Sequence, residues 1–367
     1  MDKNIILANT LIDYSLRVEE GENVLINADS HETYPLVKEL VKKIKSVKAN
    51  VEVRFKDEEI YSLEIENASD SKIKIMEKQY KFDVENFSSF IYIRYNENDY
   101  VSKNVSAETR KAIGKKLDKY KNIKVNERKW VLLDYPTRLD AYKAKMTYDE
   151  YVDFAYDVMC YDYKKMNKDI GALKLLMETT DKVRITGVDT DLTFSIKGMN
   201  VIPCVGNMNI PDGEIYCAPV KNSVNGVIKY NTPSPYQGHV YEGVKLVFKN
   251  GKIVEASCDN KDDNKKLNEI FNTDRGAKYV GEFSLGLNPR ILNPMGNILF
   301  DEKIIGSIHF TPGSAYKDSY NGNNSSIHWD MVLIQRPEYG GGNIYFDDVL
   351  IRKDGKFVLP ELKNLNK

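Results

Sequence analysis

The feature that most constrains the fold is a β-α-β pattern near the N-terminus. Residues 23–27 form a short apolar run that is typical of a buried strand, and apolar residues then recur at helical spacing over 36–44, after Pro35, which suits a first helical turn. Residues 51–56 alternate between apolar and charged side chains, as strands do. Strands joined by a helical crossover lie parallel, so a parallel sheet is predicted.

The same order of elements continues along the first half of the chain. Strand-like runs at 90–93 and 130–133 flank a helical pattern at 106–120. A longer helical region follows, from Thr147 to about residue 180, and Thr147 and Glu150 have the spacing of a capping box. We therefore predict that residues 1–184 form an α/β domain with a largely parallel sheet.

The second half of the sequence has a different pattern of apolar and polar residues. Short alternating runs are separated by Asn225-Gly226, Asn250-Gly251 and Asp354-Gly355, dipeptides that favour hairpin turns. The clearest predicted hairpin joins 244–248 to 252–256. We therefore predict that residues 185–367 form an α+β domain, mainly antiparallel β, and this domain also holds the candidate metal ligands described below.

Charge and apolar patterning exclude several classes of protein. The 367 residues include 53 Lys and Arg against 54 Asp and Glu, so a net charge of -1 gives no general attraction to nucleic acid or anionic membranes. No stretch approaches the roughly 18 apolar residues of a spanning helix, and no secretory signal pattern opens the chain, so we expect a cytoplasmic protein. The four cysteines lack C-x-x-C spacing, and neither glycine-rich phosphate motif occurs.

Two of the four histidines lie among unusual carboxylates in the second half. His328 and Asp330 are two residues apart in a strand-like segment, so both project from one face and can share a cation. His309 follows an apolar run. Glu214 follows a Pro-Asp-Gly turn, and Glu282 stands between a glycine and a phenylalanine. Each residue alone is more often an ordinary structural one, but together they indicate a metal site.

These residues occur in motifs that resemble the M29 metallo-aminopeptidases, the group of aminopeptidase T and aminopeptidase S. In the family's order, the motifs are Asn209-Ile-Pro-Asp-Gly-Glu214, Gly281-Glu282, His309, Gly313-Ser-Ala-Tyr316 and Ile327-His-Trp-Asp330. The resemblance extends over nearly the whole chain. It implies that the metal centre consists of Glu214, Glu282, His309, Tyr316, His328 and Asp330.

The resemblance implies an aminopeptidase that hydrolyses N-terminal residues from peptides through a metal-activated water. This ligand set exceeds what one tetrahedral zinc takes, but it suits two divalent ions (zinc, cobalt or manganese) if one carboxylate, for which Glu282 is the candidate, bridges them. Glu282 and Tyr316 are the candidate catalytic residues, and Tyr316 either ligates a metal or hydrogen-bonds the intermediate. The expected partners are short peptides with a free N-terminus and a second copy of the chain in a homodimer, without nucleic acid or membrane.

Two alternatives stay open. Phe310-Thr311-Pro312 stands where the family usually has Ala-Leu after its first histidine, so a peptide-binding or scaffold protein of the same fold with impaired catalysis is one alternative. The other is a glycosidase built on the carboxylate pair Glu214 and Glu282, which leaves both histidines unexplained. Turnover of peptides distinguishes the first alternative, and sensitivity to chelators distinguishes the second.

Overall fold

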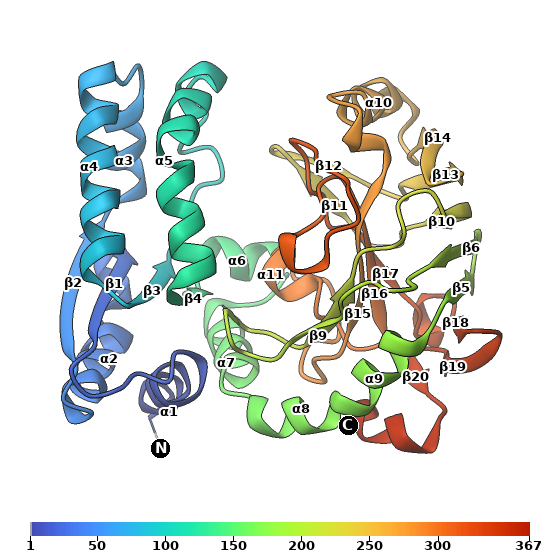
Figure 1. The fold of residues 1–367 in the computed structure, drawn as a ribbon, viewed down its shortest axis with the longest axis horizontal. Coiled ribbons are helices and arrows are strands. Elements are labelled where there is room, and N and C mark those ends of the chain that lie inside the picture. Colours follow the sequence, from blue (N-terminus) through green and yellow to red (C-terminus); the bar gives the residue numbers. More distant parts are fainter. Residues whose placement is uncertain (1) are drawn as a thin grey trace. The chain divides into compact units, whose positions relative to one another are not determined.

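The computed structural model describes residues 2–367, and their contacts divide the chain into two compact units (Figure 1). The first unit runs to Tyr161 and adds Gly206–Pro211, and the second comprises Asp162–Val205 and Asp212–Lys367. Residues 162–184, which the prediction assigned to the first domain, pack in the second unit. None of the helices in residues 2–367 combines the length and apolarity that crossing a membrane requires.

The sheet of the first unit is parallel throughout, as predicted. Its strands lie in the order β2-β1-β3-β4-β8. Their bounds are β1 (Asn23–Asp29), β2 (Asn50–Lys56), β3 (Ser89–Arg94), β4 (Lys129–Asp134) and β8 (Asn209–Ile210). The β-α-β prediction is therefore confirmed, and the short segment that carries β8 returns to this sheet from a distant part of the chain.

The helices of the first unit include the two predicted at 36–44 and 106–120 and the start of the predicted helical region after Thr147, where the Thr147–Glu150 capping box is formed. They are α1 (Lys3–Asn9), the π-helix η1 (Thr10–Ser15), η2 (His31–Thr33), α2 (Tyr34–Ser46), α3 (Glu58–Ile65), α4 (Asp70–Asn86), α5 (Ala107–Glu127), α6 (Arg138–Lys143) and α7 (Tyr148–Met159). The predicted helical region after Thr147 is interrupted, because the chain turns at Cys160 before the next helix begins.

The second unit begins with helices and continues as two antiparallel sheets. The helices are α8 (Tyr163–Asp169), α9 (Gly171–Thr179), η3 (Lys261–Asp263), α10 (Asn264–Phe271), η4 (Gly276–Lys278), α11 (Ile298–Asp301), η5 (Lys317–Ser319), η6 (Pro337–Tyr339) and η7 (Pro360–Asn366). Both α8 and α9 contact η7 near the C-terminus and bury Met166 and Leu173, which explains why they pack with this unit.

The larger sheet has the strand order β14-β13-β10-β6-β5-β18-β19-β20. Its strands are β5 (Lys182–Gly187), β6 (Thr190–Ser195), β10 (Asn225–Lys229), β13 (Lys245–Lys249), β14 (Lys252–Ser257), β18 (Gly342–Phe346), β19 (Val349–Lys353) and β20 (Lys356–Phe357). The predicted hairpin across Asn250-Gly251 is β13–β14, and both turn residues have positive φ, as such a turn requires.

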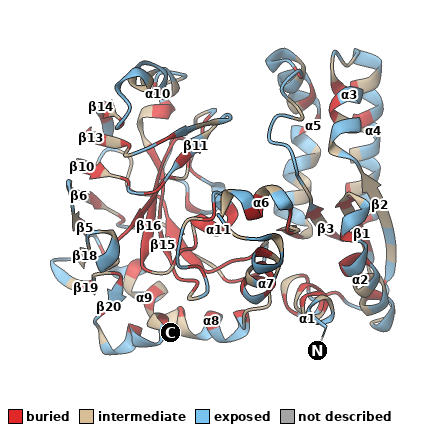
Figure 2. Cartoon of the chain, turned by 180° about the vertical axis from the view of Figure 1, so that it is seen from behind, coloured by how far each residue is buried: buried red, intermediate tan, exposed pale blue. Residues whose placement is uncertain are grey.

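The second sheet, which we call the central sheet, has the order β17-β16-β15-β9-β7. Its strands are β7 (Ile202–Cys204), β9 (Glu214–Cys217), β15 (Val280–Gly286), β16 (Ser307–Pro312) and β17 (Val332–Ile334), and a separate hairpin pairs β11 (Ser234–Tyr236) with β12 (His239–Tyr241). Every residue of β15 and β16 is buried, and Figure 2 shows these strands inside the unit.

Aromatic side chains pack the two sheets of the second unit against each other. The ring of Phe194 on β6 lies 4.9 Å from that of Phe283 and 5.1 Å from that of Phe310, and Phe248 on β13 lies 5.9 Å from Phe310. Because successive side chains of a strand alternate between faces, the neighbours of Phe283 and Phe310 project from the opposite face of the central sheet. That face carries the polar residues.

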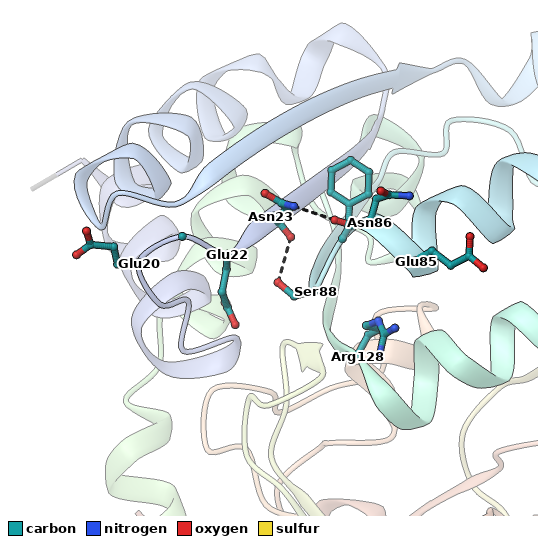
Figure 3. Close-up of a pocket in the computed structure, with 9 residues that line it drawn as sticks. Glu20, Glu22, Asn23, Glu85, Asn86, Ser88 and Arg128 are labelled. Carbon is teal, nitrogen blue, oxygen red and sulfur yellow. Dashed lines mark hydrogen bonds between the residues drawn. The ribbon is translucent and has the colours of Figure 1, made fainter.

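The first unit has a shallow depression of about 490 Å³ at the amino ends of β1 and β3 (Figure 3). Hydrogen bonds from Asn23 to the Asn86 carbonyl and from Ser88 to the Asn23 carbonyl join its two sides. The side chains of Glu20, Glu85 and Arg128 line it without converging on one point. Ligands of open α/β sheets bind at the carboxyl ends of the strands, so this depression is not a candidate site.

Candidate metal centre

Strand register brings the predicted ligands to one face of the central sheet. Ser284 on β15 pairs with His309 on β16 and with Tyr216 on β9, so these three side chains share a face. Glu282 and Glu214 stand two residues from Ser284 and Tyr216 and therefore project the same way. Residues that are far apart in the sequence thus meet because three strands of one sheet, β9, β15 and β16, present alternate positions on the same face.

Glu282 lies between the two histidines. Its Oε1 is 2.9 Å from His309 Nε2, and its Oε2 is 3.4 Å from His328 Nε2. His309 Nε2 also lies 3.3 Å from Glu214 Oε2, and His328 Nε2 lies 3.3 Å from Asp330 Oδ1. Two three-residue groups result, Glu214–Glu282–His309 and Glu282–His328–Asp330, each with its ligand atoms within 4.8 Å of one another. Glu282 belongs to both.

The segment that carries His328 and Asp330 is extended but lies outside a regular strand. His328 forms an isolated bridge with Gly313, and β17 begins only after Asp330. The expectation that both side chains project from one face agrees with their 3.3 Å separation. The position expected for His309 also differs from the observed one. His309 lies within β16, whereas the sequence placed it directly after an apolar strand.

Backbone carbonyls fix the tautomer of both imidazoles. His309 Nδ1 lies 3.2 Å from the Glu302 carbonyl, and His328 Nδ1 lies 2.8 Å from the Ser314 carbonyl. A carbonyl only accepts, so each Nδ1 carries a hydrogen and each Nε2 faces the carboxylates. Burial alone would lower the pKa of both imidazoles, but the facing carboxylates raise it, so in the absence of a cation a proton on Nε2 takes the place that a cation would occupy. Within residues 2–367, His328 Nε2 is buried and has no hydrogen-bond partner. A divalent cation fits this donor set of imidazole nitrogens and carboxylate oxygens.

A buried lysine adjoins the centre. Lys303 has no exposed surface, forms an ion pair with Glu302, and places its Nζ 3.7 Å from Glu214 Oε1. Burial by itself would lower the pKa of Lys303, but the surrounding carboxylates raise it above its ordinary value. Burial raises the pKa of Glu214 to about 8 in the absence of a cation, against the opposing effect of Lys303.

Hydroxyl groups donate to the same carboxylate oxygens of Glu214 and Asp330 that face the histidines. Ser284 Oγ donates to Glu214 Oε2 at 3.0 Å, and Thr311 Oγ1 donates to Asp330 Oδ1 at 2.7 Å. Reasoning from the sequence missed Ser284, Thr311 and Lys303. Strand alternation offered a signal for two of them, since Ser284 and Thr311 each follow a predicted ligand by two residues and so share its face.

Tyr316 lies next to the predicted ligands, since burial and then the carboxylates of Glu282 and Asp330 raise the pKa of its phenol. Its side chain is 49% exposed, and its ring lies 4.6 Å from the His328 ring and 5.7 Å from the Tyr216 ring. The ring contact places the phenol next to the Glu282–His328–Asp330 group. Its assignment as a metal ligand or catalytic residue stays a prediction.

The segment between Tyr316 and His328 is tied to its surroundings. Asn323, which is fully buried, donates to the carbonyls of Gly276 and Gly313, and Asn321 donates to those of Pro219 and Val280. Farther along, the Asp274 carboxylate accepts hydrogen bonds from Ser325 and Ser326. These hydrogen bonds hold the segment against the rest of the second unit, next to the site.

The chain is similar to a family of metal-dependent proteases over nearly its whole length. The family described as thermophilic metalloprotease (M29) matches residues 3–357. Aminopeptidase AmpS of Bacillus subtilis (strain 168) is 25% identical over 367 residues, covering 89% of this chain and 87% of that protein.

Two solved structures share the fold. Wild-type AmpT from Thermus thermophilus has a TM-score of 0.80 at 18% identity and covers 97% of this chain and 99% of its own. The 2,5-dihydroxypyridine dioxygenase from Pseudomonas putida KT2440 has a TM-score of 0.65 at 13% identity and covers 100% of this chain and 98% of its own. One fold therefore occurs in proteins with different names and reactions, so the site must decide the chemistry.

Proposed function

Since the chain belongs to the thermophilic metalloprotease (M29) family, we propose that it is a metal-dependent aminopeptidase with a dinuclear centre, which removes N-terminal residues from short peptides. The observation that carries the proposal is the position of Glu282, whose two oxygens face different histidines at 2.9 and 3.4 Å. A carboxylate shared by two three-ligand groups is the arrangement that a pair of divalent cations requires.

The charge of the surroundings supports two cations rather than one. Five carboxylates interact with one another or with Lys303 in this region, namely Asp212, Glu214, Glu282, Glu302 and Asp330. Once bound cations displace the proton of Glu214 and leave both imidazoles neutral, the five carboxylates and the charged Lys303 together carry four negative charges. Unpaired buried charge is costly, and two divalent cations neutralise four charges. Zinc, cobalt and manganese all accept mixed nitrogen and oxygen ligands.

Bound divalent ions would supply Lewis-acid polarisation of the scissile carbonyl and would lower the pKa of a water. The chain's own residues prepare the site for that chemistry. The carbonyls of Glu302 and Ser314 hold the imidazoles in one tautomer, and Thr311 orients the Asp330 carboxylate. The relative Aminopeptidase AmpS is named for removing N-terminal residues, which supports selection of a free N-terminus.

The residues after His309 support catalysis rather than its loss. The Phe310 side chain packs against Phe194 and Phe248 on the far face of the sheet, where it does not touch the ligands, and Thr311 contributes a hydrogen bond to Asp330. The departure from the family pattern at this point therefore changes the core and adds a contact to the site. The glycosidase alternative is not proposed, because His309 Nε2 lies within 3.3 Å of both candidate carboxylates.

The test measures hydrolysis of a panel of aminoacyl p-nitroanilides by purified protein before and after dialysis against a chelator. Metal analysis on the same samples gives the stoichiometry. We expect activity to disappear with the metal and to return with zinc, cobalt or manganese. Full activity in metal-free protein would refute the proposal. The homodimer expected from the family resemblance belongs to the same proposal, and light scattering on the purified protein tests it.

A further inference from the structure

The residue between two predicted ligands faces away from the metal centre. Trp329 separates His328 from Asp330 in sequence, is 3% exposed, and packs in a cluster of aromatic rings. Its ring centroid lies 4.8 Å from Tyr236, 5.5 Å from Tyr241 and 5.8 Å from Phe271. The hairpin β11–β12 and the helix α10 supply these rings, so elements outside the central sheet hold the centre of the His-Trp-Asp segment.

The two halves of the centre are supported differently. Glu214 and His309 lie on strands paired along their length, and the His309 side chain is 1% exposed. His328 and Asp330 precede β17 on an extended segment that one isolated bridge and main-chain hydrogen bonds at Ile327, Trp329 and Met331 tie to residues 310–314, and their side chains are 21% and 17% exposed. A continuous strand ladder and full burial therefore fix the first pair, whereas the second pair lies outside a regular strand, is partly exposed, and depends also on how the side chain between its two members packs.

We infer that Trp329 is a positioning residue for the Glu282–His328–Asp330 group, and that the ring cluster around it sets how tightly this half of the centre holds its cation. The inference rests on the proposed function, because it assumes that each half takes one divalent ion. Anchoring the indole on one side of the segment directs the flanking side chains to the other side. A ligand held in its binding geometry loses less entropy when the ion binds.

The environment of the indole nitrogen simplifies the interpretation of substitutions at Trp329. Within residues 2–367, Trp329 Nε1 is buried without a hydrogen-bond partner. Replacing it therefore breaks no hydrogen bond, and Trp329→Phe keeps an aromatic ring in the cluster, whereas Trp329→Leu keeps apolar bulk but removes ring stacking. Tyr236→Leu removes the nearest partner ring without altering the ligand segment, which provides a second test if the Trp329 variants fold poorly.

The experiment measures binding of manganese and cobalt to chelator-treated protein by calorimetry. Wild-type protein should bind two ions per chain. In Trp329→Leu we expect one ion to bind about 10- to 100-fold more weakly, the range seen when groups that support ligands are lost, while the other binds as in wild type. Trp329→Phe should fall between the two, and excess metal should restore turnover in both variants.

Fluorescence gives an independent readout, because the sequence holds only two tryptophans. In Trp130→Phe, which alters β4 of the first unit, Trp329 is the sole indole and should be quenched as cobalt fills the adjacent half-site. This variant should bind both ions normally. If Trp329→Leu and Tyr236→Leu each bind both ions with the same affinities as wild-type protein, the inference is overturned and the proposed function is left intact. Failure of wild-type protein to bind two ions would instead refute the dinuclear proposal.

Discussion

Replacing Glu282 by glutamine is the most direct perturbation of the proposed centre. The side chain is 3% exposed, and its two oxygens lie 2.9 Å from His309 Nε2 and 3.4 Å from His328 Nε2. Glutamine keeps the size but replaces one oxygen with an amide nitrogen, which cannot coordinate a cation. Glu282→Gln therefore removes the shared ligand while the neighbouring strands keep their packing.

The expected effect follows from the burial of this carboxylate. Removing one partner of a buried charge pair costs about 3–5 kcal/mol. Since about 1.4 kcal/mol corresponds to a factor of ten, one ion should bind roughly 100- to 4,000-fold more weakly. In the proposed mechanism this residue would support the reacting water rather than contact the substrate, so kcat should fall by a similar factor while KM changes little.

The assay combines metal stoichiometry with steady-state kinetics. Glu255→Gln is the matched control, because Glu255 is an exposed carboxylate on β14 in the same unit. The control should retain both ions and wild-type kcat. A Glu282→Gln protein that keeps two ions per chain and near-normal turnover would show that this residue is not the bridge.

Three other outcomes are expected. Acetylating the N-terminus of a good peptide substrate should abolish its cleavage, because the ammonium group is lost; equal rates for both peptides would contradict an exopeptidase. Removing the metal should lower the melting temperature by roughly 5–10 °C if an ion is present at 100 times its Kd, and an unchanged melting curve would argue against a buried centre. Burial raises the pKa of Asp29 to about 6, above the roughly 3.9 of an unfolded chain. The folded first unit therefore keeps this proton longer and loses up to about 3 kcal/mol of stability as pH rises from about 4 to 6. Asp29→Asn should remove this loss, measured as urea midpoints from Trp130 fluorescence, and parallel pH profiles for variant and wild type would contradict the assignment.

Local patterns in the sequence were sufficient to predict the elements with strong periodicity. The strand and helix from Asn23 to Ser46, the Thr147 capping box and the Asn250-Gly251 hairpin are all present. Helices α3 and α4 were not predicted. In α4, Ile73, Met76 and Val84 are buried among many charged residues, so its apolar stripe is thin. Contacts made far along the chain decide whether such a helix packs.

Some residues of the candidate site could be predicted from the sequence, and others could not. Ligand types and their order were readable because each stands in a distinctive motif, and the structure brings Glu214, Glu282, His309, His328 and Asp330 together. Lys303 could not be recognised, because a charged residue in the sequence is usually exposed, and only the fold shows that it is fully buried beside Glu214. The boundary between the two units could not be predicted from local sequence either. It depends on contacts of α8 and α9 with η7, which lies near the opposite end of the second unit's sequence.

The hydrogen bonds that orient the two imidazoles have a consequence for how this protein can vary. Their acceptors are the main-chain carbonyls of Glu302 and Ser314, groups that every amino acid supplies. In centres where a carboxylate side chain orients the histidine, one point mutation removes that support. Here a substitution at 302 or 314 leaves the main-chain carbonyl in place, so few single substitutions can remove the hydrogen bond that orients either imidazole. Diversification should therefore accumulate at Ser314 rather than at Glu302, whose side chain also pairs with the buried Lys303, and loss of function should come mainly from the ligands or from the backbone path that carries them.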